Sequence, residues 1–223
     1  MITYPATSDI SVVSLQLLLL TRGYSPGPID GIRGMRTVAA ERVASIKSGW
    51  PVGFREVWGW LRDQPRVSVQ VPRVVTPLSP AEIREALTVG HFDAFDVYPS
   101  QSRLRMVCAQ MQVEHRQIIE GIFDFNLGHV PTGRGYLGPW FSMTAEEQSR
   151  NHKLQAHKWC ASADAAEGAL LYWSHLKNTC PDALASFARD DPSHAAEQLK
   201  TGGYRTAHHP DYAMLLTQAW RAM

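Results

Sequence analysis

Four prolines divide this chain of 223 residues into two parts with different patterns. They occupy positions 65, 72, 77 and 80, and Val67, Val69 and Val71 alternate with polar residues between the first two. Proline fixes φ and lacks an N–H donor, so this stretch favours an extended strand or a linker over a helix. The sequence therefore predicts an N-terminal domain, a linker and a C-terminal domain at residues 1–60, 61–78 and 79–223.

The N-terminal part has the pattern of a small three-helix unit. Val13, Leu17 and Leu20 lie at helical spacing on one face of a first helix, which Gly23 ends. Several prolines and glycines follow, so we expect a fixed loop before a second helix over residues 35–47.

Helix signals dominate the C-terminal part. Ser79, Pro80 and Glu82 combine a capping box with a proline at the first helical position. Pro181 and Pro192 fit the first turns of two further helices. Two apolar stripes at helical spacing consist of Leu104, Val107, Cys108, Met111, Ile118 and Ile122, and of Ala166, Leu170, Trp173 and Leu176.

Two segments complete the predicted fold. A last helix is expected over residues 211–220, after Gly202 and Gly203 end the one before it. Residues 126–159 lack a clear period and have room for a short hairpin with loops. The predicted fold class is therefore mainly α, with at most a short hairpin.

Composition and charge exclude several classes of protein. Hydrophobic residues make up 44% of the chain and charged residues 19%, which is typical of a globular protein. A formal net charge of +1 argues against a nucleic-acid partner. The longest aliphatic run, Leu17 to Leu20, is far shorter than the ~20 apolar residues that span a bilayer, so no membrane insertion is expected. The first ten residues lack the features of a secretory signal, which predicts that synthesis ends in the cytoplasm.

The cysteines and histidines do not form a metal-binding pattern. Cys108, Cys160 and Cys180 are widely spaced and odd in number, so we expect reduced, buried thiols. His208 and His209 are adjacent, without an HxxEH or CxxC context. We predict neither a metal nor another cofactor.

The segment VVSLQLLLLTRGYSPGPIDGIRGMRTVAA has an ordered set of LQ, GY, DGxxG and TxxA elements. This order resembles the peptidoglycan-binding domain family over about forty residues. The resemblance implies peptidoglycan as a partner and Tyr24, Asp30 and Gly31 as wall-binding residues. Asp30 and Gly31 also have a purely structural explanation, because both residue types favour tight turns.

The C-terminal part from Ser162 onward resembles the closing half of glucosaminidase-type peptidoglycan hydrolases, including flagellar and phage members. The matching residues are Ser162, Glu167, Gly168, Ala169, Tyr172, Leu199, Lys200, Gly203, Tyr204, Thr206, Asp211, Tyr212 and Ala213. The resemblance implies a helical, lysozyme-like catalytic domain.

That family carries its acid in an Ala-Gln-x-x-x-Glu pattern, followed by an Asn-x-Gly motif. Ala109, Gln110 and Glu114 match the first pattern, and Asn126 and Gly128 match the second. The resemblance therefore implies that Glu114 is the catalytic acid. At ~100° per residue Glu114 lies at the edge of the apolar stripe, where partial desolvation favours the protonated form that a general acid needs. The alternative is an ordinary, solvated helix-edge glutamate.

A second carboxylate is common in glycoside cleavage. The candidates are Glu120, Asp124, Glu146 and Glu147, and we prefer the last two because relatives carry a hairpin glutamate in this stretch. Cleavage with a single carboxylate remains open.

The sugar strand needs further contacts. Aromatic rings stack on sugar faces, so Phe125 and Tyr204 are predicted to line the cleft, with Asn126 and Thr206 as further substrate-binding residues. Trp140, Trp159 and Trp173 fit core positions better.

Together these features predict a peptidoglycan hydrolase of the phage endolysin type, either an N-acetylglucosaminidase or a muramidase, acting as a monomer. It would be made in the host cytoplasm and reach the cell wall with a holin or as part of a virion. Two alternatives remain, namely a lytic transglycosylase and a non-catalytic virion or wall-binding protein of the same fold.

Overall fold

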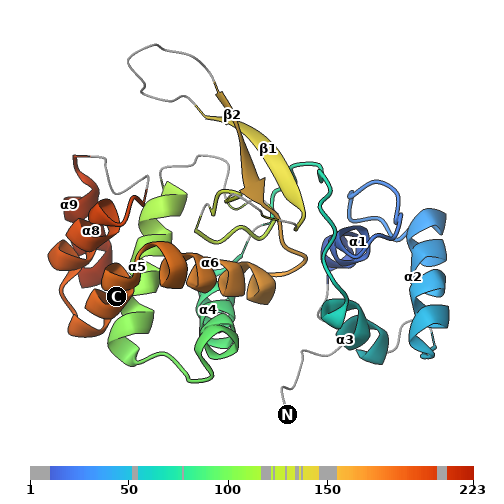
Figure 1. Ribbon diagram of the computed structural model, residues 1–223, viewed down its shortest axis with the longest axis horizontal. Helices are drawn as coiled ribbons and strands as arrows, with labels where there is room; N and C mark the ends of the chain where they lie inside the picture. The colour runs from blue at the N-terminus through green and yellow to red at the C-terminus, as the bar shows by residue number, and fades with distance from the viewer. Residues whose placement is uncertain are drawn as a thin grey trace. The chain divides into compact units, whose positions relative to one another are not determined.

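Helices dominate the structure. The computed structural model describes residues 11–51, 55–76, 78–116, 122, 124–128, 130–133, 136, 138–145, 155–204 and 210–223. Within these residues the sheet structure is one two-stranded hairpin (Figure 1), so the predicted mainly α fold class is confirmed. The chain forms two compact units, Met1–Val74 with Pro131–Asp164, and Val75–Val130 with Ala165–Met223. None of the helices in the described part combines the length and apolar character needed to cross a bilayer.

The first unit begins with three helices, as predicted. They are α1 (Val12–Thr21), α2 (Met35–Ser48) and α3 (Arg55–Asp63). The Ser11 side chain accepts a hydrogen bond from Ser14 N and so caps α1. The buried leucines of this helix are Leu15, Leu17, Leu18 and Leu19. The buried Arg22 fixes α3 against α1, since its Nε donates to the carbonyl of Leu61 at 2.9 Å. The three helices therefore share one small core.

The predicted linker pairs with the hairpin. Strand β1 (Trp140–Ala145) is antiparallel to β2 (Gln155–Cys160), with Trp140 opposite Cys160. Val71 N donates to the Trp140 carbonyl at 2.8 Å, and Trp140 N donates to the Val69 carbonyl at 2.9 Å. Extended backbone needs partners for its N–H and C=O groups, and here the hairpin supplies them.

The compact units group the chain differently from the predicted domains, whose division stays a prediction. Residues 131–164 were assigned to the C-terminal domain, but they belong to the same compact unit as the N-terminal helices. The valine alternation indicated an extended segment correctly and gave no information on its partner.

The second unit is an assembly of helices. They are α4 (Pro80–Phe95), α5 (Gln101–Arg116), α6 (Ala165–Thr179), α7 (Pro181–Ser186), the short 3₁₀ helix η2 (Phe187–Arg189), α8 (Pro192–Thr201) and α9 (Tyr212–Arg221). The predicted capping box is confirmed, because the Ser79 hydroxyl accepts from Glu82 N and the Glu82 carboxylate accepts from Ser79 N at 2.7 Å. Pro181 and Pro192 occupy first turns, as expected.

Close helix packing forms the core of this unit. A side chain at Gly90 of α4 would lie 2.7 Å from Ala169 of α6, so the glycine allows the two helices to approach. The indole of Trp173 is fully buried and donates to the carbonyl of Leu87 at 2.8 Å. His91 packs edge-on against the same indole. The expected core position of Trp173 is confirmed.

The three cysteines are buried, and none of them forms a disulfide. Burial raises the pKa of Cys108 and raises that of Cys160 to about 11, so these thiols stay protonated at neutral pH. The expectation that these thiols are packed in the interior is confirmed.

Candidate active site around Glu114

Glu114 lies in the last turn of α5. Its side chain is 1% exposed, and Val107 and Met111 on the same face are also buried. The helical spacing placed Glu114 beside these residues but at the edge of the stripe. The structure takes it fully inside, so the solvated-edge alternative is wrong.

Tyr212 holds the Glu114 carboxyl group. It is the first residue of α9, follows the N-cap residue Asp211, and donates its hydroxyl hydrogen to Glu114 Oε1 at 3.0 Å. Burial, followed by the charge of Glu114, raises the pKa of Tyr212 well above its usual value. This hydroxyl therefore remains a donor, which fixes the orientation of the carboxyl group across 98 positions of sequence.

A parallel pair lies one helical turn earlier on α5. The Tyr172 hydroxyl of α6 donates to Gln110 Oε1 at 2.5 Å, and both residues are fully buried. The pKa of Tyr172 is raised well above its usual value, first by burial and then by the charge of Glu114. The acid therefore lies within electrostatic reach of a second tyrosine.

The Asn-x-Gly motif closes the same cluster from a loop. Asn126 bonds to the backbone of Val130 in both directions, accepting from its N–H at 2.7 Å and donating to its carbonyl at 3.0 Å. A Cβ atom at Gly128 would lie 2.1 Å from the Tyr172 ring, so only glycine fits at this position. The Gly128 carbonyl accepts from the Tyr204 hydroxyl at 2.6 Å. The motif thus packs directly onto the tyrosines.

Gly168 allows the turn at Asp124 and Phe125 to pack closely against α6. A Cβ atom at Gly168 would lie 1.9 Å from the carbonyl oxygen of Phe125. Asp124 and Phe125 adopt left-handed backbone angles, with φ of 48° and 52°. The Glu-Gly-Ala element noted in the sequence therefore allows this strained turn to sit against the start of α6.

The predicted substrate-binding aromatics are largely buried. Phe125 is 7% exposed and Tyr204 is 6% exposed. Burial raises the pKa of Tyr204 well above its usual value, followed by the charge of Glu114. Both residues contribute to the cluster, and their predicted contact with sugar rings stays a prediction.

Several predicted residues lie outside the described part of the chain. They are the preferred second carboxylates Glu146 and Glu147, the alternative Glu120, the substrate residue Thr206, and His208 with His209. The remaining alternative, Asp124, is fully buried in the turn before Asn126. Nothing in the sequence distinguished Asp124 from the other carboxylates.

Sequence reasoning missed the roles of two tyrosines. Tyr172 and Tyr212 appeared only as matching positions of the family pattern, while Tyr204 received the functional role. The available signal was position, because Tyr172 lies in the middle of α6 and Tyr212 begins α9, and the family pattern contains both helices.

The predicted wall-binding loop has a clear structural basis. Gln16 of α1 accepts from the N–H groups of Asp30 and Gly31 and donates to Asp30 Oδ1 at 2.9 Å. Gly31 has a φ of 74°, which glycine adopts without strain. The Gln16 hydrogen bond lowers the pKa of Asp30. Tyr24 is 9% exposed, with Lys47 over its ring. These contacts explain the ordered motif as loop architecture, and wall binding stays a prediction.

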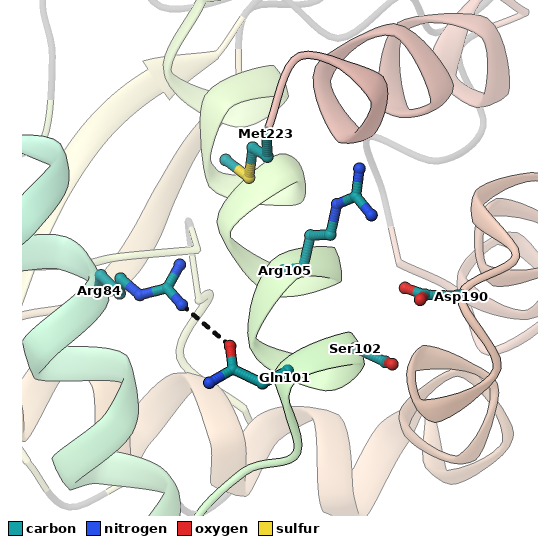
Figure 2. Close-up of a pocket in the computed structure, with 6 residues that line it drawn as sticks. All are labelled: Arg84, Gln101, Ser102, Arg105, Asp190 and Met223. Carbon is teal, nitrogen blue, oxygen red and sulfur yellow. Dashed lines mark hydrogen bonds between the residues drawn. The ribbon is translucent and has the colours of Figure 1, made fainter.

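A surface hollow of about 220 Å³ lies elsewhere in the second unit (Figure 2). Its lining residues are Arg84, Gln101, Ser102, Arg105, Asp190 and Met223. Arg105 donates to the Trp220 carbonyl at 3.0 Å and stacks on its ring, and Arg84 donates to Gln101 at 3.2 Å. At ~1.5 Å per residue along α5, Arg105 is ~13 Å from Glu114. This hollow is therefore separate from the Glu114 cluster.

Comparison with known proteins gives partial likenesses. The chain matches no protein-family model and no curated protein. A mutant of a peptidoglycan hydrolase from Sphingomonas sp. A1 aligns over 64% of this chain and 92% of its own, at 19% identity and a TM-score of 0.48. A truncated glycoside hydrolase domain of FlgJ from Salmonella typhimurium aligns over 64% and 93%, at 20% identity and 0.45. The catalytic domain of the autolysin Auto from Listeria monocytogenes aligns over 67% and 86%, at 14% identity and 0.43. At these values the likeness defines neither the substrate nor the catalytic residues of this chain.

Proposed function

We propose that this chain cleaves glycosidic bonds in the glycan strands of peptidoglycan, with Glu114 as the general acid. One observation carries the proposal. Motif residues that are far apart in the sequence meet near the buried Glu114 carboxyl group, which accepts from Tyr212, while the Tyr172–Gln110 and Tyr204–Gly128 hydrogen bonds join the neighbouring residues. A carboxyl group that is oriented and removed from bulk water is what proton delivery to a leaving oxygen requires.

The residues divide into a reacting group and its supports. Glu114 would protonate the glycosidic oxygen, while the Tyr212 hydroxyl keeps the carboxyl group in one orientation. Fixed O–H dipoles stabilise the charge left on the carboxylate without any reorganisation of water. Asn126 and Gly128 shape the adjoining loop. The glycan strand would lie beside this loop.

The variant Glu114→Gln tests this proposal. Glutamine keeps the shape of the side chain but has no proton to deliver, so cleavage of purified sacculi should fall by ~100–10,000-fold while the fold is retained. Glu85→Gln, at an exposed position of α4, is the matched control and should remain fully active. Retention of more than about a tenth of the activity by Glu114→Gln would contradict general-acid catalysis of this size.

Product analysis decides which bond is cut. Mass spectrometry of digested sacculi should show reducing N-acetylglucosamine for a glucosaminidase and reducing N-acetylmuramic acid for a muramidase. Anhydro ends would identify a lytic transglycosylase, and intact sacculi with wild-type protein would favour a non-catalytic wall-binding protein.

We also propose that the loop around Asp30 binds the cell wall. The ordered LQ, GY and DGxxG set supports this assignment. The full-length Glu114→Gln variant should co-sediment with sacculi, and the added change Asp30→Ala should release it. If Asp30→Ala also lowered the melting temperature markedly, the loss of binding would follow from a damaged fold. Asp30 would then have a purely structural role through Gln16.

The combination of wall-binding and glucosaminidase resemblances supports a further proposal, a phage endolysin that acts as a monomer. Expression in a host bacterium should cause lysis only together with a holin. Lysis in the absence of the holin would contradict this route to the wall.

A further inference from the structure

Helix α2 places its largest apolar side chains on the outside. The buried face of α2 consists of the small or polar residues Thr37, Ala40, Glu41, Ala44 and Ser45. On the opposite face Met35 is 91% exposed, Ile46 81% and Val43 47%. At ~100° per residue these three positions and Ala39 fall within an arc of about 80°. The usual arrangement, with the apolar face turned to the core, is therefore reversed in this helix.

Residues beyond both ends extend the same apolar surface. Ile32, before α2, is 66% exposed, and Trp50, after its C-cap Gly49, is 47% exposed. We call Ile32, Met35, Val43, Ile46 and Trp50 the α2 stripe. Single exposed apolar residues are ordinary, but five large ones within nineteen positions, three of them on one face of α2, favour an apolar partner.

Cations flank the α2 stripe on both sides. Arg42 and Arg36 are exposed and fall ~20° outside the two edges of the apolar arc, with Lys47 next to Arg36. The single carboxylate between positions 31 and 51, Glu41, is buried and paired with Arg33. Arg36 and Arg42 therefore flank the stripe, with Lys47, which also lies over the Tyr24 ring, beside them, in a chain whose formal net charge is only +1.

We propose that the α2 stripe binds the surface of an anionic lipid bilayer. A helix with an apolar face between cationic edges inserts that face at the boundary between headgroups and acyl chains, while its cations contact anionic headgroups. Two other partners fit less well. A second copy of this chain would bring the same cations against one another, and the polar glycan strand does not match the aliphatic Met35, Val43 and Ile46. The proposal is independent of the chemistry at Glu114.

The test uses the full-length protein and vesicle flotation. Vesicles of phosphatidylethanolamine with phosphatidylglycerol should carry the protein, whereas vesicles of phosphatidylcholine alone should not. The double variant Met35→Ser with Ile46→Ser should weaken binding by on the order of tenfold or more through the loss of apolar contact. Arg36→Gln with Arg42→Gln should weaken it by about fivefold per cation, and added salt should reduce binding by the wild type.

The matched controls lie in the other unit. Met214, 51% exposed on α9, and the exposed Arg189 of η2 are changed to Ser and Gln, and these variants should bind vesicles like the wild type. Melting temperatures of all variants are measured in parallel, and those of the α2 stripe variants should be unchanged.

The proposal would be overturned if the wild type failed to bind anionic vesicles, or if the control variants lost binding as much as the α2 stripe variants. The same failure together with loss of sacculus binding in the stripe variants would assign the stripe to the cell wall. A dimer that the stripe variants abolish would assign it to a second copy of the chain. A marked fall in the melting temperature of the stripe variants would also overturn it, because the stripe would then be covered by the chain itself.

Discussion

The hydroxyl group of Tyr212 should be worth one to two orders of magnitude in rate. Tyr212→Phe removes one buried hydrogen bond to Glu114 Oε1, of 3.0 Å, and leaves the ring in place. A hydrogen bond to a charged group contributes about 1.5–3 kcal/mol. If that contribution acts in the transition state, kcat should fall by about 10- to 150-fold at ~1.4 kcal/mol per factor of ten. KM should change little, because Tyr212 positions Glu114 and is not proposed to touch the sugar.

The assay is release of soluble muropeptides from sacculi at several substrate concentrations, with the unfolding free energy measured in parallel. Tyr98→Phe is the matched control, since Tyr98 is 66% exposed and should tolerate the change. The double variant Tyr212→Phe with Glu114→Gln should be no slower than Glu114→Gln alone, because both changes affect the same proton transfer. A wild-type kcat for Tyr212→Phe, or additive losses in the double variant, would refute the role of Tyr212 as an orienting donor.

Three further outcomes follow from the same contacts. Gly128→Ala should lower the unfolding free energy by about 1–3 kcal/mol and reduce activity, because the new methyl group overlaps the Tyr172 ring. Denaturant titration measures the loss of stability. The control is Gly59→Ala, whose added methyl group has no neighbour within 4 Å. Tyr204→Phe should destabilise the protein by ~1 kcal/mol or more through the unpaired Gly128 carbonyl, and an unchanged melting temperature would contradict this role. Burial, and then the charge of Arg103, lowers the pKa of His91, so the unfolded chain takes up a proton first as pH falls below about 6.5. The contribution of His91 to stability should therefore be fully present above about pH 6.5 and decrease as the pH falls toward the lower pKa of the folded state. Denaturation of His91→Gln at several pH values should no longer show this dependence.

The His91 prediction rests on a fixed tautomer. Arg103 can only donate, so His91 Nε2 accepts its hydrogen at 3.0 Å. His91 Nδ1 then carries the ring hydrogen and donates to the Val97 carbonyl at 2.6 Å. Protonation would place a second donor against Arg103, which explains in structural terms why the neutral form is favoured.

Local signals in the sequence located most helices. The second helix was predicted over 35–47 and is Met35–Ser48, and the last was predicted over 211–220 and is Tyr212–Arg221. Caps and prolines act within a turn of the residue that carries them, so their effect can be read without knowledge of the rest of the fold. The Ser79 capping box is the clearest case, because both of its hydrogen bonds are present.

Contacts between distant residues could not be predicted in this way. The Tyr212 and Tyr172 hydroxyl groups find acceptors 98 and 62 positions away, and no local pattern specifies such a partner. The same holds for the extended segment around Val69. Its alternation of apolar and polar residues predicts an extended strand, but it does not predict that the partner is the backbone of Trp140. The family pattern included residues that the fold brings together, while their contacts depended on tertiary packing.

The two pairs on α5 explain why Glu114, and not its neighbour Gln110, is the residue that we propose as the general acid. Gln110 and Glu114 are one helical turn apart, both are buried, and each accepts a hydrogen bond from a buried tyrosine hydroxyl. The neutral amide of Gln110 can hold Tyr172 but carries no transferable proton, so its contribution is to geometry. Glu114 differs from it by one ionisable group in nearly the same setting, and its charge raises the pKa of Tyr172, Tyr204 and Tyr212 together. The proposed proton transfer therefore belongs to position 114 and not to position 110, because the two residues differ in the chemistry of the side chain and hardly in their place in the cluster.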